Sequence, residues 1–185
     1  MARHPDLTGT FKVGPAVKTI GAYAFYKPLN TSFLQANLTS LDLSNATSLV
    51  SIGDSAFLFT DLGGTLVLPA TVTTIGRSAF ANTELTGTLK VGAAVKTIGT
   101  GAFLNVKLAG LDLSEATALI SIGDGAFRCP FICGATEGLI TGTIVTPFKV
   151  PKYTADHYDF RYDGSYGPMD RTFPPGVSIV SSMAS

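Results

Sequence analysis

The stretch Leu66-Val-Leu-Pro69, followed by Val72-Thr-Thr-Ile-Gly-Arg-Ser-Ala-Phe80, decides the fold of this chain. It ends in the hexapeptide Ile-Gly-x-x-Ala-Phe, and successive Ile residues of this hexapeptide lie 32, 23, 23 and 24 residues apart. A unit that recurs at this interval is typical of a solenoid, in which each turn buries its apolar residues against its neighbours. The copies are Ile20–Phe25, Ile52–Phe57, Ile75–Phe80, Ile98–Phe103 and Ile122–Phe127.

Each copy follows one of two lead-in patterns, of which Leu62-Gly-Gly-Thr-Leu-Val-Leu68 and Leu38-Thr-Ser-Leu-Asp-Leu-Ser44 are examples. In both patterns apolar residues recur at every second position, which is the period of a β-strand with one buried face. A Gly or Pro at or near the end of most lead-ins stops the strand and turns the chain. We expect parallel strands within Leu7–Val13, Leu38–Ser44, Leu62–Leu68, Leu85–Val91, Leu108–Ser114 and Ile140–Pro147.

These patterns predict a mainly β solenoid of five turns and a partial sixth, with a parallel sheet of about six short strands and little helix. Residues such as Leu66 and Leu68 should point inward. A segment such as Val72–Ile75 then returns along the opposite side, and the Gly after Ile is expected to adopt a positive φ. The Phe of each hexapeptide fills the interior, where one stack of rings should join Phe25, Phe57, Phe80, Phe103 and Phe127.

The solenoid also contains a longer duplication. Leu7 and Leu85 are 78 residues apart, and so are Leu62 and Ile140. The sequence therefore predicts two copies of a three-turn block over residues 1–147. Residues 148–185 leave the repeat, and their large aromatic residues and turn signals predict a C-terminal cap, with a frayed tail from Ser181 to Ser185.

The outward residues of the lead-in strands form two rows when the strands are placed side by side. One row reads Thr, Ser, Thr, Thr, Gly, Thr, and the next reads Lys, Asp, Val, Lys, Asp, Val. Parallel neighbours lie about 4.8 Å apart, so Lys12 can pair with Asp42, and Lys90 with Asp112. The candidate binding face consists of Thr10, Lys12, Ser40, Asp42, Thr65, Val67, Thr88, Lys90, Asp112, Thr143 and Val145.

Three interpretations of this face stay open. It is a solvated surface whose exposed ion pairs contribute little to stability, or a flat surface of small residues that docks a partner, as solenoids do on their extended faces. Regular threonine ladders could also match a repeating water lattice and bind ice, although Ser40 and Gly110 interrupt the row.

The run Val72–Phe80, together with Leu66-Val-Leu-Pro69, resembles the BspA-like leucine-rich repeats, also called the Treponema pallidum type. The pattern of that family is close to L-x-x-L-x-L-P…V-x-x-I-G-x-x-A-F, and the resemblance covers residues 7–147. Ser44 and Ser114 depart from it, because they stand where the family often has Pro. The resemblance implies a leucine-rich-repeat fold, a cell-surface or secreted location, and a role in adhesion and protein–protein contact. It implies no catalytic residues.

Composition and residue types exclude several other classes of protein. The 13 basic and 13 acidic residues cancel, so the electrostatic signature of a nucleic-acid binder is absent, and no apolar run approaches the roughly 18 residues of a membrane span. His4 and His157 lie outside the repeats, and no nucleophile–base grouping or phosphate-binding glycine loop is present. We therefore predict no enzymatic activity, no cofactor and no metal. Cys129 and Cys133 either form a local disulfide or remain free thiols, since two ligands do not make a zinc site.

The favoured function is a non-enzymatic recognition or adhesion module that binds a protein or surface glycan through the sheet face. The alternative is a structural solenoid that stacks end to end. The two roles differ in one observable feature: a binding module should carry an exposed patch that interrupts the regular ladder, whereas a structural unit should make end-to-end contacts.

The N-terminal end of the solenoid is expected to be poorly covered. Only Met1–Asp6 precede the first lead-in, and these residues lack an apolar segment, which predicts that they are not a signal peptide. An uncovered first strand is a template for another chain. We therefore expect either further repeats upstream or a homodimer through this end.

Overall fold

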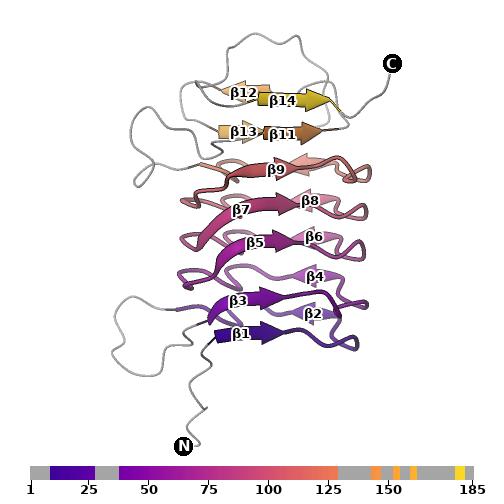
Figure 1. Cartoon of the computed structure of the whole chain (residues 1–185), viewed down its shortest axis with the longest axis vertical. Coiled ribbons are helices and arrows are strands. Elements are labelled where there is room, and N and C mark those ends of the chain that lie inside the picture. The colour runs from indigo at the N-terminus through magenta and orange to yellow at the C-terminus, as the bar shows by residue number, and fades with distance from the viewer. Residues whose placement is uncertain are drawn as a thin grey trace, which may run out of the picture.

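The structure is a computed structural model of the whole chain, and it describes residues 9–27 and 38–128 together with the backbone of four further strands. Each of the first five turns contributes one strand to the front of the solenoid and a two-residue strand to the back, and a sixth strand, β11, continues the front (Figure 1). The front strands are β1 (Gly9–Lys12), β3 (Leu38–Asp42), β5 (Gly63–Val67), β7 (Glu84–Lys90), β9 (Gly110–Asp112) and β11 (Thr143–Thr146). The back strands are β2 (Thr19–Ile20), β4 (Ser51–Ile52), β6 (Thr74–Ile75), β8 (Thr97–Ile98) and β10 (Ser121–Ile122).

This arrangement confirms the predicted mainly β solenoid, and no helix occurs among the residues that the structure describes. The six expected front strands are present and pair in parallel, but they form two sheets instead of one. Strands β1 and β3 make the first sheet, and β5, β7, β9 and β11 follow one another in the second. The single sheet that the sequence predicts is thus divided between β3 and β5.

The C-terminal segment adds to the second front sheet. Strand β14 (Ser178–Ser181) pairs in parallel with β11, and Ser181 lies opposite Thr146. Ser181, where the sequence predicts that a frayed tail begins, is the last residue of this strand, and residues 182–185 lie outside the described part of the chain. Strands β12 (Lys152–Thr154) and β13 (Asp159–Arg161) form a separate antiparallel pair.

The back of the solenoid is continuous. Strands β2, β4, β6, β8 and β10 form one parallel sheet, in which the Ile of each hexapeptide pairs with the Ile of the next turn. All of these Ile side chains are buried, so the hexapeptide supplies both the ladder and one wall of the core. The residues in this row are Ile20, Ile52, Ile75, Ile98 and Ile122.

The predicted stack of phenylalanine rings is confirmed. The ring centroids of successive turns lie 5.1, 5.0, 5.2 and 5.4 Å apart from Phe25 to Phe127, with interplanar angles of 3° to 11°. These separations are typical of offset-stacked aromatic pairs. The ring of Phe11, tilted by 55° and 4.6 Å away from Phe25, ends the stack at the first turn.

The expected role of the Gly after Ile is wrong. Its φ is not positive, and the positive values fall two residues later, at Tyr23, Ser55, Ser78, Gly101 and Gly125. The Gly is needed because the turns approach closely at the back. A Cβ at Gly76 would lie 2.6 Å from the backbone nitrogen of Asp54, and a Cβ at Gly99 would lie 2.7 Å from that of Arg77. No other residue fits at such distances.

Candidate functional site

The residues of the candidate binding face whose side chains are described lie on the outer side of the front strands. Inward neighbours such as Leu66 and Leu89 are buried, and Phe11 and Leu41 are half-buried, whereas Val67 is 54% exposed. The five exposed members are Thr10, Lys12, Thr65, Val67 and Lys90, and the half-buried members are Ser40, Asp42, Thr88 and Asp112. Thr143 and Val145 belong to β11, but their side chains lie outside the described part of the chain.

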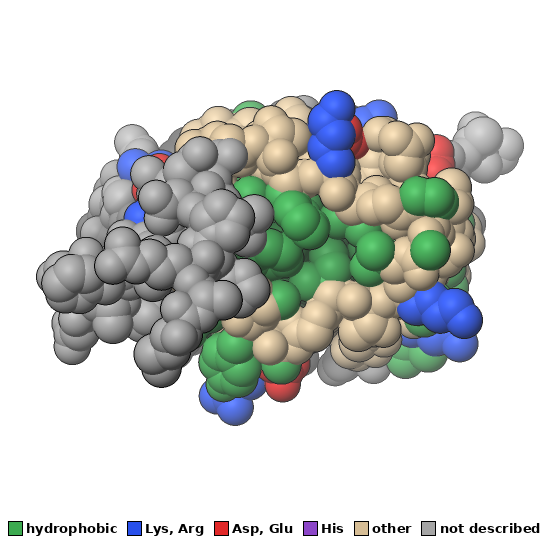
Figure 2. Space-filling view, turned by 90° about the horizontal axis from the view of Figure 1, so that it is seen from below, with side chains coloured by type: hydrophobic (Ala, Val, Ile, Leu, Met, Phe, Trp, Pro, Cys, Tyr) green, Lys and Arg blue, Asp and Glu red, His purple; other side chains and the backbone are tan. Residues whose placement is uncertain are grey.

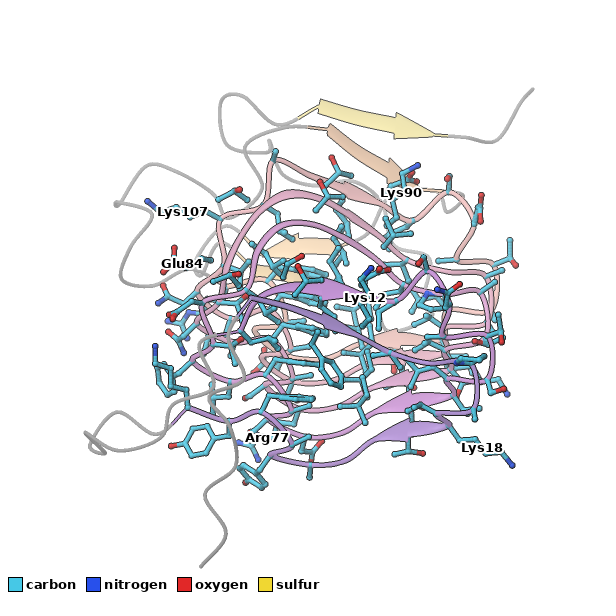
Figure 3. The ribbon with its side chains drawn as sticks, turned by 60° about the horizontal axis from the view of Figure 1, so that its bottom comes forward. Lys12, Lys18, Arg77, Glu84, Lys90 and Lys107 are labelled. Atoms are coloured by element: carbon cyan, nitrogen blue, oxygen red, sulfur yellow. The ribbon has the colours of Figure 1, made fainter. Side chains whose placement is uncertain are left out.

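The two predicted ion pairs form across neighbouring strands. Lys12 Nζ lies 4.0 Å from Asp42 Oδ2, and Lys90 Nζ lies 3.8 Å from Asp112 Oδ2. In Figure 3 the lysines of both pairs, Lys12 and Lys90, lie on the front of the solenoid. Arg77 and Lys18 lie away from them. The lysine side chains are 76% and 59% exposed, so solvent weakens both pairs and leaves these cations available to a partner.

Each of these aspartates is also held by the serine two residues later. Ser44 N donates to Asp42 Oδ1 at 3.0 Å, and Ser114 N donates to Asp112 Oδ1 at the same distance. Hydrogen bonds from Ser44 lower the pKa of Asp42, more than the charge of Lys12 does. Burial pushes the pKa of Asp112 upward, but the bonds from Ser114 and the charge of Lys90 outweigh it, so that pKa is also lowered.

These turns explain why serine replaces the expected proline in the second lead-in pattern. Asp followed two residues later by an N–H donor closes a local turn through the side chain, and proline would remove that donor. The repeated Asp-Leu-Ser at residues 42–44 and 112–114 is the signal in the sequence for these turns. The alternation of apolar residues does not reveal it.

The front ladder is open between β3 and β5. At three other junctions the residue after a front strand donates to the next strand: Val13 N to Asp42 O, Leu68 N to Lys90 O and Val91 N to Asp112 O, each at 3.0 Å. No corresponding bond joins Leu43 N to Val67 O, and no residues of β3 and β5 are paired.

The opening does not extend to the back of the solenoid. Ile52 of β4 pairs with Ile75 of β6 in the same two turns, and the rings of Phe57 and Phe80 lie 5.0 Å apart. The two turns are therefore joined at the back and separated at the front.

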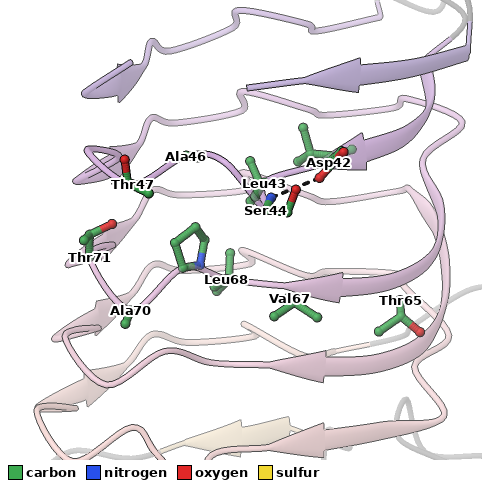
Figure 4. A pocket seen from close by; sticks show the side chains of 12 residues that line it. Asp42, Leu43, Ser44, Ala46, Thr47, Thr65, Val67, Leu68, Ala70 and Thr71 are labelled. Carbon is green, nitrogen blue, oxygen red and sulfur yellow. Dashed lines mark hydrogen bonds between the residues drawn. The ribbon is translucent and has the colours of Figure 1, made fainter. Parts of the chain in front are cut away.

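A groove of about 710 Å³ lies at this break, within the range of ordinary ligand sites. Figure 4 shows its two walls, one from β3 and the turn that follows it, the other from β5 and its turn. The first wall consists of Leu41, Asp42, Leu43, Ser44, Ala46 and Thr47, and the second of Thr65, Val67, Leu68, Pro69, Ala70 and Thr71. Asp42 is the one charged side chain in this lining.

The start of β5 gives a physical reason for the break. Gly63 and Gly64 stand where the other lead-ins of this type have Thr-Gly, and Gly64 has a φ of 77°. Two adjacent glycines weaken a strand. Gly63 and Gly64 still pair with Glu84 and Leu85 of β7, but the register is irregular between Gly64 and Leu66. At the junction that the predicted duplication makes equivalent, Leu111 of β9 lies opposite Ile144 of β11, so that junction is closed.

Other chemistry finds no support in the part of the molecule that is described. In that part, no three His, Cys, Asp or Glu side chains lie together as metal ligands. The described residues also contain no helix with the length and apolar character of a bilayer span. Cys129, Cys133, His4 and His157 lie outside them, so the state of the two thiols stays a prediction.

Stacked parallel strands, an inner face of leucine and isoleucine, and one ring per turn define the chain as a leucine-rich-repeat solenoid. A family model described as the BspA type leucine rich repeat region matches residues 29–133, in six copies. Because this match covers more than half of the sequence, the chain belongs to the BspA-type leucine-rich repeat family. Members of leucine-rich-repeat families are generally non-enzymatic modules. No curated protein and no solved structure matches the chain.

Proposed function

We propose that this chain is a non-enzymatic recognition module that binds a protein partner through its front face, centred on the break between β3 and β5. The break is the observation that carries the proposal, since an exposed patch that interrupts the ladder distinguishes a binding module from a purely structural repeat. A structural repeat is most stable with a closed ladder. An unpaired buried backbone group costs about 1–3 kcal/mol.

The chemistry of the face supports a protein as the partner. Val67 offers exposed apolar surface beside the groove, while Lys12, Asp42 and Lys90 offer charges of both signs along the same face. Mixed apolar and charged surface suits contact with another protein better than contact with a polyanion. Family membership supports adhesion at a cell surface as the setting.

A mapping experiment tests the proposal. A partner is selected from a displayed library of small folded domains against the full chain, and its affinity is then measured for variants of the two faces. Val67→Arg and Thr65→Arg should each weaken binding at least about tenfold, because a bulky cation would stand at the centre of the contact. Thr74→Arg, on the exposed side of the back sheet, is the matched control and should leave affinity unchanged. Partners insensitive to both front variants would contradict the proposal.

A second candidate role is pairing of two copies through the N-terminal end, which a specific observation favours. Val17 is 38% exposed, whereas Val72 and Val95, at the same repeat position, are fully buried. No described atom lies within 4 Å of a Cβ built on Gly21, although the equivalent Gly99 touches the preceding turn. Figure 2 looks at this end and shows hydrophobic side chains gathered in its middle.

Light scattering over a range of concentrations tests the pairing. The wild-type chain should form a dimer that Val17→Lys converts to a monomer, because the lysine charge would be buried in the contact. Ile120→Lys, at a position 62% exposed in the fifth turn, is the control and should leave the dimer intact. A monomer at every concentration, or loss of the dimer with both variants, would exclude this contact.

A further inference from the structure

We propose that the break between β3 and β5 accepts an extended peptide segment that carries a basic side chain beside an apolar one. This inference rests on the proposed recognition function and names the kind of partner that the same site takes.

The backbone of the two walls calls for an extended peptide. By analogy with the closed junctions, the N–H of Leu43 faces the break from one wall, and the C=O of Val67 faces it from the other. Leu43 is only 5% exposed, so its unpaired donor is poorly served by water. An occupant must therefore accept from one wall and donate to the other, which a peptide bond does at every residue. An extended segment repeats these groups with the period of the strands themselves.

The side chains of the groove select for charge. Asp42 is the one charged residue in the lining, and a peptide lysine or arginine would complement it. Bonds from Ser44 lower the pKa of Asp42 and keep the carboxylate ionised. The present neighbour, Lys12, lies at 4.0 Å with a side chain 76% exposed, so it is a weak partner that a ligand cation can replace.

The apolar part of the occupant has its own contact. Val67 is 54% exposed on the outer face, and Leu41 and Pro69 continue the apolar lining beside it. A valine or leucine two positions from the basic residue would lie on the same side of an extended peptide and could cover this surface.

The walls can hold such an occupant without rearrangement of the core. The back ladder at Ile52 and Ile75 and the stacked rings of Phe57 and Phe80 fix the two turns relative to each other. The ligand need not separate two paired strands, which reduces the free energy lost on binding. The front must still widen to admit it, because residues of β3 and β5 lie within 8 Å of one another, Cα to Cα, whereas the two neighbours of an inserted strand lie about 9.6 Å apart.

The test uses the full chain labelled with ¹⁵N and a synthetic probe, acetyl-Thr-Val-Lys-Val-Thr-amide. Binding in the millimolar range should shift the amide resonance of Leu43 and slow its hydrogen exchange. Asp42→Asn should weaken binding about two- to fivefold, as expected for loss of one exposed ion pair. Asp112→Asn is the matched control, because Asp112 has a corresponding serine and lysine partner but lies beside a closed junction. This variant should leave binding of the probe unchanged.

Two probe variants separate peptide pairing from simpler contacts. Methylation of alternate backbone nitrogens removes the donors and should abolish the Leu43 shift, and replacement of the probe lysine by glutamate should weaken it. An equal shift with the methylated probe would overturn the inference, since the groove would then take any small apolar molecule. No shift at Leu43 up to about 10 mM would overturn it as well.

The outcome for the peptide is distinguishable from the outcome for the proposed function. If the probe fails while a selected protein partner still depends on Val67, recognition by the front face stands and the peptide inference is wrong. If the probe fails and no selected partner depends on Val67, both are wrong.

Discussion

The junction between β3 and β5 and the junction between β9 and β11 occupy corresponding positions in the duplication that the sequence predicts, yet one is open and the other is closed. Asp42 of β3 and Asp112 of β9 each accept a hydrogen bond from the serine two residues later. Each also has a lysine within 4.0 Å. Strand β9 pairs with β11 through Leu111 and Asp112, whereas β3 pairs with β1 alone. The comparison shows that side chains along a strand do not by themselves determine whether the next turn closes onto it.

The difference between these junctions is confined to the front of the solenoid. Turns two and three stay joined through Ile52, Ile75 and the rings of Phe57 and Phe80. The core therefore carries the stability of the stack across the break. Backbone groups at the front can therefore stay unpaired without loss of the stack, and it is there that we propose recognition takes place.

The largest expected effect tests that continuity of the core. Phe80→Ala should destabilise the protein by about 3–5 kcal/mol, because the ring is fully buried between Phe57 and Phe103. Val67→Ala, on the exposed front beside the break, should change stability by less than about 0.5 kcal/mol. Chemical denaturation measures both, and a shift within error for Phe80→Ala would contradict the placement of the ring.

Glycine substitutions sharpen the comparison at the back. Gly76→Ala in the third turn and Gly99→Ala in the fourth should each destabilise the protein by about 1–3 kcal/mol. In both variants the new Cβ would overlap the backbone of the preceding turn. Gly21→Ala is the control and should be neutral, since no described atom faces it. If Gly76→Ala were as mild as Gly21→Ala in thermal melts, the break would extend through the back as well.

Replacing Gly63 by threonine, which the other lead-ins of this type carry, should close the junction between β3 and β5. Gly63→Thr places a Cβ 3.4 Å from the carbonyl oxygen of Glu84, which is an acceptable contact. Removal of one strand glycine should stabilise β5 by about 0.5–1 kcal/mol. The N–H of Leu43 should then become protected from exchange. Unchanged exchange in the variant would show that Gly63 is not the cause of the break.

The smallest expected effect is on acid stability. The folded pKa of Asp112 is lowered, so its ionised form stabilises the fold above the unfolded pKa of about 3.9, and this contribution is lost as pH falls through the folded value. At pH 7, Asp112→Asn should lower the free energy of unfolding by less than about 1 kcal/mol, and the melting temperature should fall slightly. The difference from wild type should disappear near pH 2. A difference that persists there would assign the effect to packing.

Much of the fold could be predicted because it depends on local periodicity. Alternation in Leu66-Val-Leu68 determines which side chains are buried, and the fixed position of Phe in each turn determines the stack. The pairs Lys12–Asp42 and Lys90–Asp112 follow from strand register alone. These features need only the ordinary spacing of paired strands, which is the same at every closed junction.

The break and the role of the repeated Gly could not be predicted in the same way. Both depend on how closely two turns approach, which is a contact between residues more than 20 positions apart, such as Gly76 with Asp54. The Gly63-Gly64 pair was the available signal, but the alternation at Leu66 and Leu68 still indicated an ordinary paired strand. Strand propensity belongs to one segment, whereas strand pairing depends on where two segments lie. The alternation in β5 therefore could not show whether β3 pairs with it.

Hydrogen exchange at Leu43 is the most direct test of the claim that the front face opens for recognition. Native-state exchange measured by NMR should find the N–H of Leu43 exchanging far faster than those of Leu68 and Val91, which donate to the next strand at 3.0 Å. Protection of Leu43 equal to that of Leu68 and Val91 in the free protein would mean that β3 and β5 are paired. There would then be no break, and the proposed recognition site would be lost.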